Sequence, residues 1–433
     1  MKLGAKRGRN GIALAAVAVG ALAAAACGGG SSSSSSSGGG AGAPITFAAP
    51  VSLDGALSVE GQLTYHGYQY CAKVVNDKGG ITFGGQSHQL KLVTQDDQSS
   101  PEHAATLVDQ FNDQGYKFIL SPYGSGSTAK VAPVVERNGQ VMADSNGADP
   151  GIFDKGYTHT FGVLSLAPEY GKSIIDAFAS MNPAPKTVAI IAADDGFSQS
   201  SASGAAQEAQ AKNMTVVPSA TAYQSATKVT ANTNDVSSAL QAVASAKPDV
   251  ILIAGHFNEP VATIKQGREL NIKPAMGYGA TVTVGDSKFV ALGAIVNGVI
   301  GSTQWVPTVK TSKTDPLFGT AQQFAAGYSQ AYPGDVVNGS PGYQAVEATA
   351  ACETLVRGIE AAGSTDPAKV RDAMASLNFD SFYGHIQFDS HGANSTKPMY
   401  AIQIQGEPNS AKLVTVWPSS EASGSPLWPV PAA

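Results

Sequence analysis

The segment Ser-Pro-Tyr-Gly-Ser-Gly-Ser-Thr at 121–128 has the composition of a loop that binds an anion. Gly124 and Gly126 allow the backbone to approach a ligand closely, and Ser125 offers a hydroxyl group. A helix is predicted to follow at once, and its free amide groups and dipole favour a carboxylate. The alternative is that Ser127 only caps this helix. No Gly-Lys-Ser/Thr pattern follows, so the loop is not a phosphate-binding P-loop.

Three further loops follow predicted strands and carry polar or aromatic groups. The pair Asn146-Gly147 tolerates left-handed backbone angles and exposes backbone groups, as many turns do. Phe197 and His256 each follow a different apolar strand. In parallel α/β sheets, ligands bind beyond the carboxyl ends of the strands, which makes these residues candidates for contact with a ligand. A lone histidine is equally often structural, and both readings of His256 stay open.

Catalytic patterns are weak in this sequence. There is no Gly-x-Ser-x-Gly elbow, and the adjacent acids Asp96/Asp97 and Asp194/Asp195 are interpreted as turn residues at strand ends. The seven histidines are scattered and no Cys/His cluster has the spacing of a metal site. We therefore expect a protein that is not an enzyme and needs no metal or cofactor. A hydrolase whose triad assembles across the fold is a distant alternative.

Strands and helices alternate along most of the chain, which predicts an α/β fold with parallel sheets built from βαβ units. Two series of similar length suggest two lobes, and long helices follow them. The predicted strands are 45–49, 90–94, 118–120, 141–143, 187–192, 216–218, 250–254, 275–277, 385–388, 400–405 and 413–416. The predicted helices are 59–77, 101–113, 128–138, 168–181, 200–211, 236–246, 260–270, 317–332, 343–361 and 367–377.

The beginning of the chain predicts export. Residues 1–26 contain four cations followed by an uncharged apolar run, which is typical of a signal peptide. The run is shorter than the ~20 residues that a membrane-spanning helix needs. Small residues directly before Cys27 resemble a bacterial lipobox, although Ala24 stands where leucine is usual. Residues 27–43 would then be a lipidated cysteine and a Gly/Ser tether with a reach of roughly 20–24 Å.

Charge restricts the partners of the exported body. The whole chain has a formal net charge of −6, and removing the four cations of residues 1–26 leaves about −10, since no anion is lost. An acidic body disfavours nucleic acid and a polybasic membrane face. The predicted contact with the membrane is therefore the lipid on Cys27. We expect an extracytoplasmic protein held at the cell membrane by that lipid.

The order of motifs resembles the type I periplasmic binding proteins, specifically the leucine/isoleucine/valine-binding branch. These proteins capture substrates for ABC importers. The resemblance covers Pro44 to about Trp417 and rests on four motifs and on the order of elements. The motifs are Val51-Ser-Leu-Asp-Gly, Val75-Asn-Asp-Lys-Gly-Gly-Ile, Leu92-Val-Thr-Gln-Asp-Asp and Tyr123-Gly-Ser-Gly-Ser-Thr.

The resemblance implies two Rossmann-like lobes with parallel sheets, joined by three crossovers that close around a small ligand. By analogy the crossovers are Val163–Ala167, Ile300–Val306 and Asp389–Lys397. The first lobe would comprise 44–164 and 301–388, and the second lobe 165–300 and 389–417, leaving 418–433 as a loose tail.

The resemblance also implies a ligand site. Ser125 matches the serine that holds the ligand carboxylate, in a loop that also contains Tyr123 and Gly126. Asn146 and Gly147 belong to the next ligand-contacting loop, and Ala148 stands where that loop has a threonine.

On the other side of the implied site, Phe197 and His256 match the aromatic clamp positions. The acid that binds the ammonium group of amino acids should fall near Tyr278, and no carboxylate is present there. Glu60, at an aromatic position of the cleft mouth, could replace it, or could be a solvated residue at the start of a helix. The preferred ligand is therefore a carboxylate-bearing or amide-like small molecule, with an α-amino acid second.

Cys71 and Cys352 remain in the exported body, and their spacing alone leaves a disulfide and two buried thiols equally open. The resemblance places both on helices of the same lobe and so favours the disulfide. The predicted function is a lipid-anchored solute-binding protein that delivers its ligand to an ABC permease. The alternative is a lipoprotein that senses the ligand for a membrane receptor.

Overall fold

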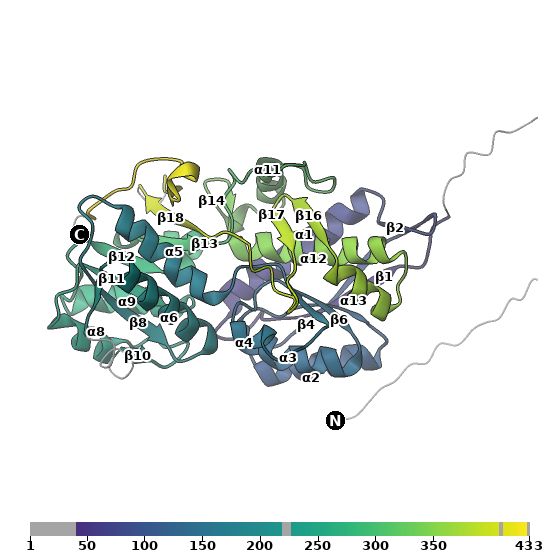
Figure 1. Cartoon of the computed structure of the whole chain (residues 1–433), viewed down its shortest axis with the longest axis horizontal. Helices are drawn as coiled ribbons and strands as arrows, with labels where there is room; N and C mark the ends of the chain where they lie inside the picture. Colours follow the sequence, from purple (N-terminus) through teal and green to yellow (C-terminus); the bar gives the residue numbers. More distant parts are fainter. Residues whose placement is uncertain (1–39, 219–226, 407–409, 431–433) are drawn as a thin grey trace, which may run out of the picture. The chain divides into compact units, whose positions relative to one another are not determined.

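The computed structural model describes residues 40–218, 227–406 and 410–430. The predicted signal peptide and Cys27 lie outside these residues. These described residues form one compact unit that contains two main sheets, and Figure 1 shows helices on both faces of each. Within the described segments, no helix is both long enough and apolar enough to span a bilayer.

The first sheet has five parallel strands in the order β4-β1-β5-β6-β7. Its strands are β1 (Ile45–Val51), β4 (Leu90–Asp96), β5 (Phe118–Leu120), β6 (Val141–Asp144) and β7 (Thr160–Gly162). Side chains of β1 alternate between the two faces, as a pleated strand requires. Phe47 and Ala49 pack into the core with helices α1 and α12, whereas Ala48 packs with α2 and α3. Helices therefore cover both faces of this sheet, as the predicted βαβ pattern demands.

Seven helices accompany the first sheet. They are α1 (Ser58–Asp77), α2 (Pro101–Asp113), α3 (Ser125–Asn138), α4 (Pro150–Phe153), α11 (Ala321–Ala331), α12 (Tyr343–Ala362) and α13 (Pro367–Ala375). Cys71 of α1 and Cys352 of α12 are joined by a disulfide with a Cα–Cα distance of 6.2 Å, as the resemblance implied. The bond ties two helices that are far apart in sequence and lie side by side over the same face (Figure 1).

The second sheet has the order β10-β8-β11-β12-β13-β18-β19, and β9 also pairs with β8. Its strands are β8 (Thr187–Ala193), β9 (Thr215–Val216), β10 (Lys228–Val229), β11 (Val250–Ala254), β12 (Gly277–Ala280), β13 (Ile300–Thr303), β18 (Tyr400–Gln405) and β19 (Lys412–Trp417). Only β13/β18 and β18/β19 pair antiparallel among these strands. Residues 301–303, assigned to the first lobe from the sequence, thus belong to β13 of this sheet.

Alternation along β8 again separates two helix layers. Val188 and Ile190 pack with α5 (Ala167–Ser180) and α6 (Gly196–Ala211), and Ala189 and Ile191 pack with α8 (Ser237–Ala244) and α9 (Asn258–Glu269). The short helix α10 (Ser287–Val290) follows β12. The described residues also contain four short 3₁₀ turns: Thr283–Gly285, Gly293–Val296, Pro333–Asp335 and Ser419–Glu421.

Three small hairpins occur in the described residues. They are β2 (Ile81–Phe83) with β3 (Gln86–His88), β14 (Val336–Val337) with β15 (Ser340–Pro341), and β16 (Asn378–Ser381) with β17 (Gly384–Gln387). Of these strands only β17 was predicted, as 385–388. The other five have two to four residues each and leave too little alternation in the sequence to be recognised.

The three segments predicted as crossovers meet one another. Ser165 Oγ donates to the carbonyl of Lys397 at 2.6 Å, and Ser165 N donates to Gln304 Oε1 at 3.0 Å. The Nζ of Lys397 donates to the carbonyl of Gln304 at 2.7 Å. One residue of each segment therefore takes part in a single hydrogen-bond network. The lobe boundaries themselves stay a prediction.

Residues 418–430, predicted to be a loose tail, make contacts with the second sheet. Trp428 packs against the second core, its ring 5.7 Å from that of Phe178, and its Nε1 donates to the carbonyl of Pro183 at 2.9 Å. Gln403 of β18 pairs with the backbone of Leu427 in both directions. A composition rich in Ser, Pro and Ala hid one partly buried tryptophan, whose ring packs on the second core.

The last residues of the predicted tether are also packed. Ala41 forms a bridge with Ser87 of β3, and Gly42 N donates to the Ser87 carbonyl at 2.8 Å. His88 Nδ1 lies 2.8 Å from the carbonyl oxygen of Ala43. A side chain at Gly42 would collide with the His88 ring, so glycine is required by this close approach. The tether itself stays a prediction, and its last residues contact β3.

Candidate ligand site

The order of strands defines one topological switch point in each sheet. In the first sheet β1 lies between β4 and β5, so the connections leaving β1 and β5 diverge to opposite sides. In the second sheet β8 lies between β10 and β11 with the same consequence. Ligands of open α/β sheets bind at the carboxyl ends of such strand pairs. The four loops involved begin α1, α3, α6 and α9, and they carry Glu60, Ser125, Asp195 and His256.

The α3 loop presents an open helix N-terminus. The helix begins at Ser125, three residues before the predicted start, because Gly124 adopts a φ of 86° that only glycine accepts easily. No side chain caps the helix, and the Ser127 hydroxyl is buried with no hydrogen-bond partner in the described part of the chain. The alternative that Ser127 is only a cap was therefore wrong.

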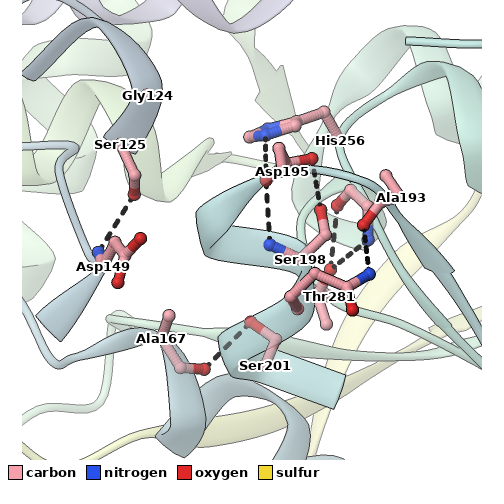
Figure 2. A network of polar contacts seen from close by, with 12 residues as sticks. Gly124, Ser125, Asp149, Ala167, Ala193, Asp195, Ser198, Ser201, His256 and Thr281 are labelled. Atoms are coloured by element: carbon pink, nitrogen blue, oxygen red, sulfur yellow. Dashed lines mark hydrogen bonds and ion pairs between the residues drawn. The ribbon is translucent and has the colours of Figure 1, made fainter. Parts of the chain in front are cut away.

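Ser125 is held in position by the backbone of the next loop. Its Oγ accepts a hydrogen bond from Asp149 N at 3.0 Å, as Figure 2 shows. Accepting that bond leaves the hydroxyl hydrogen able to point to another acceptor. Gly126 follows in the first helical turn, where backbone amides lack partners within the helix. The α3 start can thus donate both a hydroxyl and amide hydrogen bonds to an anion.

Three of the predicted residues converge across the two sheets. The hydroxyl of Tyr123, in the α3 loop, lies 3.3 Å from His256 Nδ1, in the α9 loop. The ring of Phe197, at the start of α6, lies 5.2 Å from the His256 ring. All three side chains are buried. The switch point of the first sheet thus contacts the switch point of the second.

Asp195 was interpreted as a turn residue, and it has a second role. Its carboxylate caps α6 by accepting hydrogen bonds from the backbone and the side chain of Ser198. The same carboxylate lies 3.8 Å from His256 Nε2 (Figure 2). Asp195 follows β8 as His256 follows the neighbouring strand β11, so the shared position at two strand ends could have revealed the pair.

Electrostatics make His256 a cation. Burial by itself lowers the pKa of the imidazole, but the carboxylates of Asp195, Glu60 and Glu259 together raise the pKa of His256 to about 9. For Asp195, burial raises the pKa, yet His256 and the Ser198 hydrogen bonds lower the pKa to about 2. At neutral pH the site therefore holds an imidazolium group beside an ionised carboxylate.

Glu60 is buried, which contradicts the reading of a solvated residue at a helix start. It lies in the first turn of α1, and its Oε1 accepts a hydrogen bond from Phe257 N at 2.9 Å. Its Oε2 has no hydrogen-bond partner among the described residues. Burial raises the pKa of Glu60 to about 7, although nearby His256 opposes that shift.

In the loop after β6, two backbone amides that could have contacted a ligand are already hydrogen-bonded within the loop. The amides of Asn146 and Gly147 both donate to Asp144 Oδ1, at 3.1 and 2.8 Å, so an acid of the same loop occupies them. Asn146 Nδ2 donates to Ser145 Oγ at 2.6 Å, and its Oδ1 is buried without a partner in the described structure. The buried side-chain oxygens of this loop that have no partner among the described residues are Asn146 Oδ1 and Asp144 Oδ2, and both could accept from a ligand.

Tyr278 does not join this group. It lies within β12, two residues before the strand ends, and packs against the α8/α9 side with Leu240 and Ile272. Its hydroxyl lies near Gly267 of α9 rather than at the carboxyl edge of the sheet. A side chain inside a strand points to a helix-covered face, and this explains its absence from the site.

Two aromatic residues of the site were missed. Tyr170 of α5 contacts Phe197 edge-on with ring centres 5.1 Å apart, and Tyr343 of α12 lies 6.2 Å from Tyr170. They form one buried apolar cluster with Phe197. Each occupies an ordinary helical position, so no sequence signal separates it from a core residue. No group of three or more metal-ligating side chains occurs within the described segments.

Comparison with known proteins agrees with this geometry. The model of the family described as "Periplasmic binding protein" matches residues 44–410, and the chain belongs to that family. Its fold is that of the type I, leucine/isoleucine/valine-binding branch, as the sequence resemblance indicated.

Relatives and solved structures of this kind are distant in sequence. The leucine-, isoleucine-, valine-, threonine- and alanine-binding protein of Pseudomonas aeruginosa is 24% identical over 353 residues, covering 80% of this chain and 86% of the relative. A leucine-binding protein from Thermotoga maritima has a TM-score of 0.71 at 20% identity, over 85% of this chain and 97% of the other. A solute-binding protein from R. palustris in complex with benzoate has a TM-score of 0.71 at 19% identity, over 86% and 95%. At these identities the structural likenesses establish the fold.

Proposed function

We propose that this protein is a solute-binding component of an ABC importer that captures a small carboxylate-bearing ligand between two lobes. Each sheet with its helices forms one lobe in this proposal. The observation that carries it is the meeting of the two switch points, where the Tyr123 hydroxyl lies 3.3 Å from the His256 imidazole. The open start of α3 and the His256 cation provide the donors and the positive charge that a carboxylate requires.

The ligands named for similar proteins support this class. One structural neighbour holds benzoate and another binds leucine, and both molecules bear a carboxylate on an apolar body. The apolar body would meet Phe197, Tyr170 and Tyr343, which form the buried aromatic cluster next to His256. An amino acid ligand places an ammonium group in the site as well, and Glu60 is the buried acid available to it.

The proposal includes a location and a partner. We propose that Cys27 carries a lipid that holds the protein at the outer face of the cell membrane, close to the permease of the importer. The support is the sequence pattern of residues 1–27. Cys27→Ala should release the protein into the medium, as immunoblots of membrane and culture fractions would show. Retention of the variant at the membrane would contradict the lipid anchor.

A ligand screen tests the central proposal. Thermal unfolding is measured with leucine, leucinamide, benzoate and benzamide, so that each carboxylate has an amide of matched shape. A ligand present at 100 times its dissociation constant stabilises the folded protein by ~2.7 kcal/mol, which is readily seen as a rise in Tm. We expect at least one carboxylate to raise Tm and its amide partner to have a much smaller effect. Equal shifts within both pairs, or no shift at all, would overturn the proposal.

A further inference from the structure

We propose that Glu60 determines specificity by requiring an N–H or O–H donor on the ligand, at a point away from its carboxylate. This inference rests on the proposed function and adds the second recognition element of the same site. It favours amino acids and hydroxylated aromatic acids over the corresponding acids that lack a donor. A ligand with a second carboxylate at this point would be rejected.

The first observation is that Glu60 already occupies the N-terminus of α9. Glu60 belongs to the α1 turn of the first sheet, and its Oε1 accepts from Phe257 N, the residue that precedes α9 in the second sheet. Phe257, at the N-cap position of α9, makes no capping side-chain hydrogen bond, and Glu259 of the first turn accepts from His256 N at 3.0 Å, just before the helix. A carboxylate of the protein therefore fills the position where a helix dipole would otherwise attract an anionic ligand.

The second observation is the other oxygen of the same group. Glu60 Oε2 is buried and has no hydrogen-bond partner in the described structure. A buried carboxylate oxygen without a donor is unfavourable, and donors convert it into a strong charge-assisted contact. The side chains that interact electrostatically with Glu60 include His256, Asp286, Tyr123 and Tyr343, and His256 is already paired with Asp195 and Tyr123. The unsatisfied oxygen thus matches a donor supplied by the ligand.

The two carboxylate oxygens of Glu60 have different roles: Oε1 links the two sheets, and Oε2 selects the ligand. Oε1 joins the α1 turn to the α9 turn by accepting a hydrogen bond from the backbone amide of Phe257. Oε2 discriminates, because hydrocarbon placed against it leaves the oxygen unpaired and a second carboxylate adds repulsion. A site that is built to pair a polar group rejects analogues that lack it more strongly than an apolar pocket rejects a small change in shape.

The test uses pairs of ligands that differ only in the donor. Dissociation constants are measured calorimetrically for leucine and 4-methylpentanoate, and for 4-hydroxybenzoate and benzoate. The wild-type protein is compared with Glu60→Gln, which keeps an oxygen for Phe257 N–H but turns the second atom into a donor. Glu102→Gln is the matched control, since Glu102 occupies the first turn of α2 and is exposed.

We expect wild type and Glu102→Gln to bind the donor-bearing member of at least one pair tenfold or more tightly than its partner. Glu60→Gln should remove or invert that preference while unfolding as cooperatively as wild type. Equal affinity within each pair for wild type overturns this inference and leaves the proposed function standing. A preference that survives in Glu60→Gln also overturns it. Binding of none of the four ligands contradicts the proposed function itself, and this inference with it.

Discussion

Of the four helix N-termini at the candidate site, those of α3 and α9 have opposite electrostatic environments. The start of α3 carries glycine and serine residues, no capping side chain and no acid in its first turn. The start of α9 has Glu259 in its first turn and receives the Glu60 carboxylate from the other sheet. One helix dipole is left for an incoming anion, whereas the other is already neutralised by the protein.

This difference assigns a direction to the proposed ligand. Its carboxylate belongs at α3, between Ser125 and the His256 cation, because a second anion at α9 would meet Glu60. The α9 side keeps its charge balance internally, through Asp195 and His256. The N-terminus of α3 is therefore free to bind the ligand carboxylate, whereas the N-terminus of α9 is surrounded by charged groups that the protein itself pairs.

The largest expected effect on stability comes from removing the carboxylate that pairs with His256 on the α9 side. Asp195→Ala removes the α6 cap and the acid beside the buried His256, and should lower the free energy of unfolding by roughly 2–4 kcal/mol. Loss of the His256 proton limits the damage. Urea denaturation measures the change. Asp194→Ala is the control, because Asp194 is exposed and pairs with Lys228 at the surface, so it should cost less than about 1 kcal/mol. Equal effects of the two variants would contradict the special role of Asp195.

Protonation of His256 gives the next effect. The folded pKa of about 9 exceeds the ordinary value of 6.5, so its stabilising contribution is fully present below pH 6.5 and disappears as pH rises through 9. Between pH 6.5 and 8 this loss is about 1.5 kcal/mol. We expect the unfolding free energy of Glu60→Gln to fall over this range relative to that of Glu60→Gln/His256→Gln, a background in which Glu60 cannot titrate. The fall should be smaller than about 1.5 kcal/mol, because Glu60→Gln removes one of the three carboxylates that raise the pKa of His256. Parallel pH profiles of the two variants would show that His256 is not held as a cation.

The smallest expected effect tests the contact between the ligand carboxylate and the start of α3. Ser125→Ala removes a donor from the α3 start and should raise the dissociation constant of the better-binding acid, leucine or benzoate, about tenfold, near the value for one hydrogen bond to a charged group. Ser127→Ala, two residues on, should change it less than about twofold. Isothermal titration calorimetry distinguishes these results. A larger effect at Ser127 would move the carboxylate contact deeper into the first turn of α3.

The alternation of strands and helices was predictable because each element carries a strong local pattern. The bounds of α2, β5, β11 and β18 agree with the prediction to the residue. Short hairpins and the packing of residues 40–43 escaped, since bridges of one to four residues depend on contacts made only after folding. The tail escaped for a related reason: Trp428 finds its partner Phe178 some 250 positions away.

The residues of the candidate site also fall into those that the sequence predicts and those that it does not. Positions directly after strands, such as Ser125, Phe197 and His256, follow from topology alone, because strand ends of a parallel sheet share an edge. Asp195 was placed at that edge but assigned only a local role, since its partner lies on another loop. The helical positions of Tyr170 and Tyr343 depend on how α5 and α12 pack, which no spacing in the sequence encodes.

The Cys71–Cys352 bond makes a covalent ring of 281 sequence positions, and β4 to β13 all lie within it. The ring contains the complete βαβ series of the second sheet up to β13 and the first two of the three segments that meet at Gln304. One cut of the backbone at any point from 72 to 351 would therefore leave both fragments attached to each other. Such a nicked molecule would migrate as two pieces only after reduction.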